Sequence, residues 1–391
     1  MSYNFDATIE RRGTDCEKWD LLEKIFGTTD VLPFWVADMD FAAAPGIAAA
    51  LQARASHPVY GYQTKEEKVF HAAMAWEARR HGWVIERDWI LNTPGVVASL
   101  SAAVLSLTSP GDKIVIQPPV YPPFFTCVTR NGRQVVENPL RERNGCWEMD
   151  LADLERKLDP TVKMLILCSP HNPVGRVWTR DELRTLGDIC LRHGITVLAD
   201  EIHCDLVFPG HRHVPFASLG REYANASVTF FSPSKTFNIA GTYTSFVVLP
   251  DPDKHRRYGD LVAALDIGEG NLFGLTAAEA AYKTGGDWLD NLLSYLGANA
   301  DALVDFARRE LPGVRVEKPE GTYLAWLDFR TRFTDHDALK KFLIHDAKVG
   351  LSDGLSFGRQ GAGFARFNFA CPRTLMLEGL SRIADALRKK G

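Results

Sequence analysis

Asn172, Asp200 and Lys235 each follow shortly after an apolar stretch of the sequence, and their side chains differ in chemistry. A lysine amine with a lowered pKa attacks carbonyl groups, and a carboxylate can keep a neighbouring heteroaromatic nitrogen protonated. An amide can donate a hydrogen bond to a phenolic oxygen. If the fold brings these three residues together, they could bind a cofactor that carries an aldehyde, a ring nitrogen and a hydroxyl group.

The apolar stretches have the pattern of a buried sheet. Strand-like runs alternate with helical patterns between about residues 88 and 250, and the predicted strands are Trp89–Asn92, Lys113–Gln117, Lys163–Cys168, Ile195–Ala199, Val228–Phe231 and Ser245–Leu249. Continuous apolar runs separated by helices, here Gly95–Leu107 and Arg180–His193, indicate an α/β fold with a mostly parallel sheet covered on both faces. Ligands bind beyond the carboxyl ends of such strands, so the three side chains are expected to meet in one crevice.

A fourth strand end supplies a different part of the site. Gly95 opens the helix predicted after the first strand, and the free N–H groups at a helix start bind phosphate. Pyridoxal 5′-phosphate (PLP) needs N–H groups for its phosphate, a carboxylate for its pyridine nitrogen, an amide for its O3′ and a lysine for its aldehyde. An aromatic ring stacked on the cofactor would complete the site, and Tyr121 is the candidate. The sequence therefore predicts a PLP site.

Each of these residues also has a simpler structural interpretation. Asp200 could cap a helix or pair with a cation, and Lys235 could belong to a structural ion pair. Gly95 could open a turn for steric reasons alone. The conjunction of all of them, in this order along the chain, favours the PLP site.

The chain after about residue 281 has a different pattern. A long helical stretch, Trp288–Glu310, is followed by short strands around Tyr323–Phe329 and Phe364–Phe369, which indicates a second, α+β domain. Alternation in the last strand places Arg366 and Asn368 on the face opposite to the aromatic residues. Arg366 could bind the carboxylate of a ligand or form a structural salt bridge, and the residues alone leave both possibilities open.

The bulk composition is that of an ordinary globular enzyme. Of the 391 residues, 46% are hydrophobic and 24% are charged, and the formal net charge is −4. We expect no nucleic-acid or membrane partner, because the sequence has neither a concentrated basic segment nor an apolar run long enough to span a bilayer. The seven cysteines include no Cys-x-x-Cys pair, and the first residues lack the apolar core of a signal peptide, so a reduced, cytoplasmic protein is expected.

Two other groups of residues could suggest a different ligand. One segment contains four possible metal ligands, His203, Cys204, His211 and His213. Their spacing fits no common zinc pattern, so no metal is expected. The glycine-rich segment 358–363 precedes a strand and not a helix, which argues against a dinucleotide-binding loop.

Taken motif by motif, the chain resembles the fold-type I PLP enzymes of the class I/II aminotransferase superfamily and, within them, the MalY/PatB-type cystathionine β-lyases, or C–S lyases. The resemblance covers essentially the whole length, and its motifs are Leu32–Phe41 (LPFWVADMDF), Tyr60–Tyr62 (YGY), Thr93–Val97 (TPGVV), Pro118–Phe124 (PPVYPPF), Pro170–Arg176 (PHNPVGR), Asp200–His203 (DEIH), Ser232–Asn238 (SPSKTFN) and Phe364–Asn368 (FARFN). The chain is therefore expected to divide into a large PLP-binding domain (46–280), a small C-terminal domain (281–391) and an N-terminal segment (1–45) that packs with the small domain.

The resemblance implies a role for each site residue. Lys235 would be the Schiff-base lysine, Asp200 would pair with the pyridine nitrogen, and Asn172 would hydrogen-bond O3′. Tyr121 would stack on the ring, and Arg366 would bind the substrate α-carboxylate, with Asn172, Tyr121 and Ala37 also near the substrate. The other implied contacts are the phosphate ligands Gly95, Val96, Val97, Ser232 and Ser234, His203 near O3′, and Tyr60, which would reach into the neighbouring subunit's site. A homodimer with shared active sites is thus implied.

Two positions depart from the wider aminotransferase pattern. Tyr243 stands where many aminotransferases carry a phosphate-binding arginine, and His203 stands where a tyrosine is common. Both residues follow the lyase branch. His203 could be a structural residue, tune O3′ or carry a proton.

The activity implied by the resemblance is β-elimination of L-cysteine S-conjugates such as cystathionine, which releases a thiol, pyruvate and ammonia. An aminotransferase with the same site is the alternative, because the same lysine could return the proton to the cofactor. A regulatory, protein-binding role on the same fold is an alternative of another class. The sequence does not indicate which S-substituent is preferred.

Overall fold

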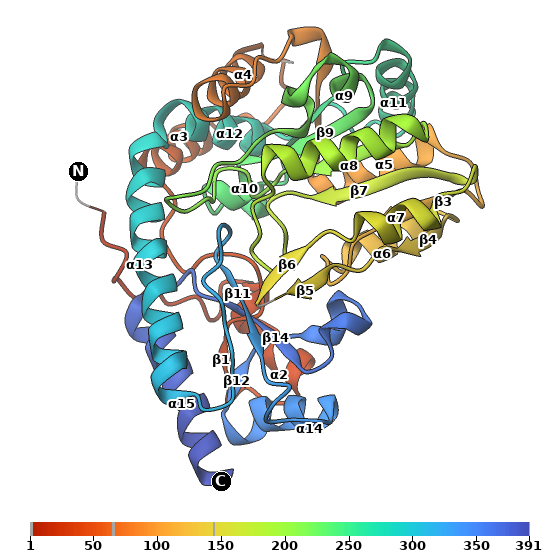
Figure 1. Cartoon of the computed structure of the whole chain (residues 1–391). Coiled ribbons are helices and arrows are strands. Elements are labelled where there is room, and N and C mark those ends of the chain that lie inside the picture. Colours follow the sequence, from red (N-terminus) through yellow and green to blue (C-terminus); the bar gives the residue numbers. More distant parts are fainter. Residues whose placement is uncertain (1–2, 65–66, 144, 391) are drawn as a thin grey trace.

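The computed structural model, which describes residues 3–64, 67–143 and 145–390, has a seven-stranded sheet at the centre of its larger part (Figure 1). The strands in spatial order are β2 (Ile90–Thr93), β10 (Ser245–Val248), β9 (Ser227–Phe231), β8 (Thr196–Asp200), β7 (Val162–Cys168), β3 (Lys113–Ile116) and β4 (Gln134–Glu137). Neighbours from β9 to β4 pair in parallel, whereas β10 runs antiparallel to β2 and to β9. The predicted α/β fold with a mostly parallel sheet is confirmed.

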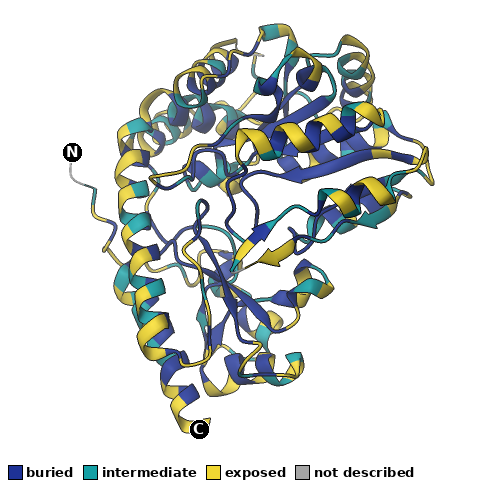
Figure 2. Cartoon of the chain, viewed as in Figure 1, coloured by how far each residue is buried: buried dark blue, intermediate teal, exposed yellow. Residues whose placement is uncertain are grey.

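Helices cover both faces of this sheet. Successive side chains of a strand point to opposite faces, so the apolar side chains of the sheet belong to two separate cores. The core on one face includes residues of α5 (Val96–Leu107), α6 (Pro123–Thr129) and α11 (Pro252–Ala264). The core on the other face includes residues of α7 (Leu151–Lys157) and α8 (Arg180–Arg192). Figure 2 shows the strands buried between helices whose outer faces are exposed.

Helix α8 illustrates how the sequence defines an element of this layer. The Thr179 hydroxyl accepts a hydrogen bond from the Glu182 N–H, and the Glu182 carboxylate accepts one from the Thr179 N–H at 2.8 Å, which is a capping box. The buried residues Leu183, Leu186 and Cys190 recur every three or four positions. This spacing turns one side of α8 towards the sheet.

A second, three-stranded antiparallel sheet has the order β11 (Leu324–Asp328), β14 (Phe364–Asn368), β13 (Ser352–Asp353). Its core includes residues of α13 (Gly286–Glu310), α14 (His336–Lys341) and α15 (Arg373–Lys390). The N-terminal part contains α1 (Glu17–Asp20), α2 (Leu22–Phe26) and β1 (Leu32–Pro33), and β1 pairs in parallel with β12 (Val349–Gly350). This pairing supports our proposal that residues 1–45 pack with a C-terminal domain of residues 281–391. Residues 1, 2 and 391 lie outside the described part.

The remaining elements surround the main sheet. Helix α12 (Leu272–Thr284) contacts α3 (Pro45–Ser56) and α4 (Glu67–His81), while α9 (Arg221–Asn225) precedes β9 and α10 (Pro233–Thr236) follows it. A hairpin of β5 (Arg141–Arg143) and β6 (Cys146–Glu148) extends towards the second sheet (Figure 1). None of the helices within the described residues is long and apolar enough to cross a membrane.

Candidate functional site

The carboxyl ends of β7, β8 and β9 lie side by side and carry the predicted amide, carboxylate and amine. Cys168, the last residue of β7, pairs with Asp200, the last residue of β8, and Asp200 pairs with Phe230 of β9. Asn172 follows shortly after β7, and Lys235 lies in α10, which follows β9. Asp200 and Lys235 are close enough for each charge to shift the pKa of the other group. The three side chains that the sequence predicts to meet are therefore carried at neighbouring strand ends, at the edge called the crevice below.

The Lys235 side chain is held at the base of this crevice. Its Nζ donates a hydrogen bond to the Ala37 carbonyl at 2.7 Å. The short helix α10 is capped by the Ser232 hydroxyl, which accepts from the Ser234 N–H at 3.1 Å. Burial lowers the pKa of Lys235 to about 8, although the nearby Asp38 carboxylate opposes this shift. An amine with this pKa has an appreciable neutral fraction near neutral pH, which nucleophilic attack on an aldehyde requires.

Asp200 is 4% exposed, and its Oδ1 accepts a hydrogen bond from the Ile202 N–H at 3.1 Å. Ile202 lies in a turn, so Asp200 does not cap a helix, and this oxygen only accepts one backbone hydrogen bond. Burial raises the pKa of Asp200 to about 7. Because a neighbouring cation favours the ionised carboxylate, a protonated pyridine nitrogen placed here would form an ion pair with Asp200.

Arg366 joins the second sheet to the crevice. Its Nη1 donates to Asn172 Oδ1 at 3.1 Å, and its Nη2 donates to the Trp35 carbonyl at 2.6 Å and to Ser352 Oγ at 3.0 Å. Within the described ranges, Arg366 has no ion pair with a carboxylate and its buried Nε has no hydrogen-bond partner. Burial lowers the pKa of Arg366 to about 10. A buried guanidinium without a counter-anion favours a ligand carboxylate over a structural salt bridge.

The start of α5 offers backbone N–H groups. Gly95 precedes the helix with φ +156°, a conformation that glycine tolerates, and no side chain of the described residues caps the helix. The first intrahelical bond runs from the Ser99 N–H to the Gly95 carbonyl at 3.0 Å, so the N–H groups of Val96 and Val97 have no acceptor within the helix. This arrangement fits a phosphate group.

Two strands connect the start of α5 to the serines before Lys235. Ser232 Oγ donates to the Thr244 carbonyl at 2.6 Å, and the hydroxyl groups of Ser245 and Thr93 are 2.9 Å apart. The Ser232 and Ser234 hydroxyl oxygens are 2.7 Å apart, and because the Ser232 hydrogen goes to the Thr244 carbonyl, Ser234 is the donor of this pair. The two predicted groups of phosphate ligands, at the starts of α5 and α10, are thus linked through the adjoining strands β2 and β10.

Tyr121 and His203 are neutral groups beside the same charges. Burial, together with the charges of Lys235 and Arg366, lowers the pKa of His203 to about 3, and its Nδ1 has no hydrogen-bond partner in the described part of the chain. Burial, together with Asp200, raises the pKa of Tyr121 to about 12. A histidine with this pKa is uncharged at neutral pH and has a single ring N–H, which favours a structural or O3′-tuning role. Tyr121 remains a neutral ring that could stack on the cofactor.

The structure places the other two predicted residues very differently. The Ala37 carbonyl lies in the site, where it accepts from Lys235 and from the Tyr323 hydroxyl at 2.9 Å. Tyr60 is 59% exposed, and its hydroxyl donates to the Ala55 carbonyl at 2.6 Å. Within one chain, Tyr60 is therefore part of the surface and not of the crevice.

Sequence reasoning did not predict Tyr323 and Ser352. Tyr323 is buried, and its ring lies 5.9 Å from that of His203, centroid to centroid. Ser352 donates to the Trp35 carbonyl at 2.7 Å and accepts from Arg366. Tyr323 could have been found, because it directly precedes the strand that pairs with the strand of Arg366. Ser352 lies in a two-residue strand that no sequence pattern indicates.

The histidine-rich segment does not gather into one site. His203 lies at the crevice, whereas His213 Nε2 is 3.1 Å from the Glu201 carboxylate. Among the described residues, the possible metal ligands of Glu77, His81 and Cys204 lie within 4.8 Å of one another. The statement that the chain holds no metal stays a prediction.

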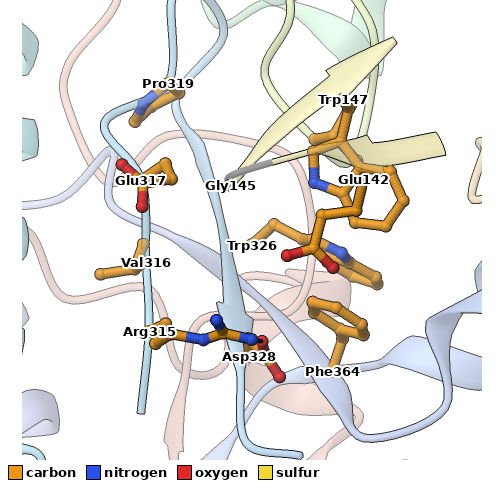
Figure 3. A pocket seen from close by; sticks show the side chains of 11 residues that line it. Glu142, Gly145, Trp147, Arg315, Val316, Glu317, Pro319, Trp326, Asp328 and Phe364 are labelled. Atoms are coloured by element: carbon orange, nitrogen blue, oxygen red, sulfur yellow. Dashed lines mark hydrogen bonds and ion pairs between the residues drawn. The ribbon is translucent and has the colours of Figure 1, made fainter. Parts of the chain in front are cut away.

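A separate cavity of about 380 Å³ lies between the β5–β6 hairpin and the second sheet (Figure 3). Trp147 and Trp326 line it, and Arg315 forms an ion pair with Asp328 at 2.7 Å on its wall. Trp326 is paired directly with Arg366 between β11 and β14. The cavity is therefore a neighbour of the crevice, but none of the predicted site residues lines it.

Comparisons with known proteins agree with this geometry. Residues 29–383 match the family model of class I and II aminotransferases. Cystathionine beta-lyase PatB of Bacillus subtilis (strain 168) is 46% identical over 98% of this chain and 100% of its own length, and protein MalY of Escherichia coli (strain K12) is 36% identical over 99% of both chains. The crystal structure of cystalysin from Treponema denticola, which contains PLP, superposes with a TM-score of 0.97 at 38% identity over 100% of both chains. The chain therefore belongs to the class I and II aminotransferase family and, within it, to the MalY/PatB-type cystathionine β-lyases.

Proposed function

We propose that this protein is a PLP-dependent carbon–sulfur β-lyase that converts L-cysteine S-conjugates such as cystathionine to a thiol, pyruvate and ammonia. The observation that carries the proposal is the position of Arg366, a buried guanidinium without a carboxylate partner among the described residues, beside the low-pKa amine of Lys235. This pair suits an amino-acid substrate, whose carboxylate and Cα hydrogen would face the two groups.

The residues of the crevice fit PLP. Lys235 would bind its aldehyde, Asp200 its pyridine nitrogen and Asn172 its O3′, with Tyr121 against the ring. The phosphate would lie between the N–H groups at the start of α5 and the hydroxyls of the α10 turn. The chemistry that PLP supplies when bound is an electron sink for the electron pair left on Cα after proton removal.

Arg366 would orient the substrate. Its free Nε and its Nη atoms offer a fork of donors that matches a carboxylate. The Asn172 amide and the Trp35 carbonyl hold the guanidinium plane in place, so little ordering is needed when the substrate binds. Ser352 supports the same guanidinium from the other strand.

Lys235 would be the base that removes the Cα proton of the bound substrate. The sulfur on Cβ then leaves as a thiolate, and a proton reaches it from Lys235 or from Tyr60 of the partner subunit. The remaining three-carbon fragment hydrolyses to pyruvate and ammonia. Elimination is favoured whenever sulfur stands on Cβ, because a thiolate is a better leaving group than hydride or carbon.

The proposed assembly is a homodimer in which each subunit contributes Tyr60 to the other's site. Tyr60 and Phe273 form an exposed aromatic surface with ring centroids 5.9 Å apart. The residue Tyr243 is 68% exposed, and its carbonyl accepts a hydrogen bond from Asn271. The exposed surface therefore continues towards α10, the short helix with Lys235, which we call the lysine turn. Exposed aromatic residues that adjoin one another are common at protein interfaces. A cytoplasmic location stays a prediction.

Two assays separate the lyase from the alternative aminotransferase. L-Cystathionine is supplied without any keto acid, and L-alanine or L-aspartate is supplied with 2-oxoglutarate. The lyase should release pyruvate and thiol continuously in the first assay and form only a trace of glutamate in the second. Fast glutamate formation without thiol release would assign the aminotransferase activity instead.

A further inference from the structure

Asp205 receives hydrogen bonds from three side chains, one of which is the neighbour of Lys235 in the chain. Trp76 Nε1 is 3.0 and 3.1 Å from its two carboxylate oxygens, His81 Nε2 is 3.0 Å from Oδ1, and Thr236 Oγ1 donates to Oδ2 at 2.8 Å. Asp205 is 6% exposed. Thr236 is the residue next to Lys235, so one buried carboxylate links helix α4 to the turn that carries the amine.

The charges around Asp205 make this link an ion pair. Burial opposes ionisation of Asp205, but the contacts with His81, Thr236 and Trp76 outweigh it and lower its pKa. The pKa of His81 is raised to about 9 against the effect of burial, because Glu77 and Asp205 stabilise its charged form. Burial raises the pKa of Glu77 and of Glu201 to about 8 each. At neutral pH a protonated His81 therefore donates to an ionised Asp205.

The lysine turn needs such an anchor because it is short. Helix α10 has four residues, too few to be stable by its own backbone bonds. Ser232 ties its start to the Thr244 carbonyl, and beyond its end Asn238 donates to the Met39 and Phe41 carbonyls at 3.0 and 2.9 Å. Between these two ends, Thr236 adds a hydrogen bond to the buried Asp205 carboxylate, next to Phe237, which packs against Trp76.

We propose that Asp205 is a positioning residue that acts through the Thr236 hydroxyl to fix the direction in which Lys235 presents its amine. The inference rests on the proposed role of Lys235 as the cofactor-binding lysine. Without the Thr236 hydrogen bond the lysine turn can rotate. The Lys235 amine would then occupy the crevice in only part of the molecules. The amine should then gain contact with water, which moves its pKa up towards the 10.5 of an ordinary lysine.

The test compares Thr236→Val, which keeps the side-chain shape and removes the hydroxyl, with Thr236→Ser, which keeps the hydroxyl. Tyr223→Phe is the matched control, since it removes a hydroxyl–carboxylate bond of 2.6 Å to Asp188, far from the site. The readouts are the rate at which the cofactor-free protein takes up PLP, the pH midpoint of the visible band of the loaded protein, kcat with L-cystathionine, and Tm.

Thr236→Val should slow PLP uptake at pH 7 and lower kcat, each about tenfold, because a misplacement of about 1 Å can cost about 100-fold and a smaller one is expected here. In Thr236→Val the pH midpoint of the visible band should differ from that of the wild type, whereas KM should stay within about twofold of the wild-type value. Thr236→Ser should match the wild type in all readouts. Tyr223→Phe should change Tm alone. Asp205→Asn, which removes the charge with little change of shape, should reproduce the Thr236→Val effects.

The proposal is overturned if Thr236→Val and Asp205→Asn lower Tm but leave PLP uptake, band midpoint and kcat at the wild-type values, because the network would then be structural only. If either variant fails to fold, the other decides. A wild-type protein that forms the band but releases no thiol would refute the lyase activity and leave the comparison of uptake rates intact.

Discussion

The Arg366 guanidinium donates a hydrogen bond of 3.1 Å to the Asn172 side-chain oxygen, and this contact joins the two sheets of the molecule at the site. Asn172 follows β7 of the large sheet, whereas Arg366 lies in the centre of the small sheet. The residue proposed to bind the cofactor O3′ is thus in direct contact with the residue proposed to bind the substrate carboxylate. Any movement of one sheet relative to the other would change both binding sites together.

Arg366→Ala should lower kcat/KM for all amino-acid substrates by about 100-fold, because two charge-assisted hydrogen bonds to the carboxylate are lost. Arg366→Lys should have a smaller effect, since it keeps the charge but not the forked geometry. Steady-state kinetics measure both. Arg315→Ala, which removes an arginine from the wall of the neighbouring cavity, is the control and should leave kcat/KM unchanged. Equal kinetics for wild type and Arg366→Ala would place the carboxylate elsewhere.

Asp200→Asn should lower kcat by roughly 100-fold or more while PLP remains bound, because the amide cannot hold a protonated pyridine nitrogen. The absorbance spectrum of the variant reports cofactor binding, and single-turnover kinetics report the chemical step. An unchanged chemical step would mean that Asp200 serves only as the acceptor for the Ile202 N–H.

The rate of PLP uptake by the cofactor-free protein should depend on pH through Lys235. The neutral amine is the reactive form, so the rate should rise with pH up to about 8 and then level off, instead of rising to 10.5 as for an ordinary lysine. Stopped-flow absorbance measures this profile. The positive charge of Arg366 helps to lower the pKa of Lys235, so Arg366→Ala should move the plateau to higher pH. A rate that still rises above pH 9 in the wild type would contradict the buried position of the amine.

Mixed dimers test whether Tyr60 acts in the neighbouring subunit. Lys235→Ala and Tyr60→Phe subunits, each impaired alone, should regain activity when they exchange, because each mixed dimer has one site with both native residues. Random exchange gives half mixed dimers, so about a quarter of all sites should be active. Activity is measured after separation and re-association of the two variants. No recovery, with mixed dimers present by mass spectrometry, would place Tyr60 outside the shared site.

The large sheet could be predicted from the sequence because its strands are buried on both faces. Their continuous apolar runs stand out, and all six predicted strands differ from the observed ones by at most one residue at either end. Strand β4 was missed because Gln134–Glu137 mixes polar and apolar residues at the edge of the sheet. The polar residues of the crevice were found for the same reason as the strands, since they follow directly after apolar runs.

The contacts made by the N-terminal segment could not be predicted in this way. The carbonyl groups of Trp35 and Ala37 accept hydrogen bonds from Arg366 and Lys235, the two cations of the site. Backbone carbonyls are present at every residue, so only the path of the chain distinguishes these two. Asp205 was missed for a related reason: its partners Trp76 and His81 are distant in sequence, and only the packing of α4 brings them together.

The most direct measurement locates the lysine that carries the cofactor. The loaded protein is treated with borohydride, which reduces the carbon–nitrogen double bond between PLP and a lysine to a stable amine, and the digested protein is analysed by mass spectrometry. One modified residue per chain is expected, and it should be Lys235. Modification of a different lysine, or a loaded protein that gains no mass on reduction, would contradict the assignment of Lys235 as the centre of the active site.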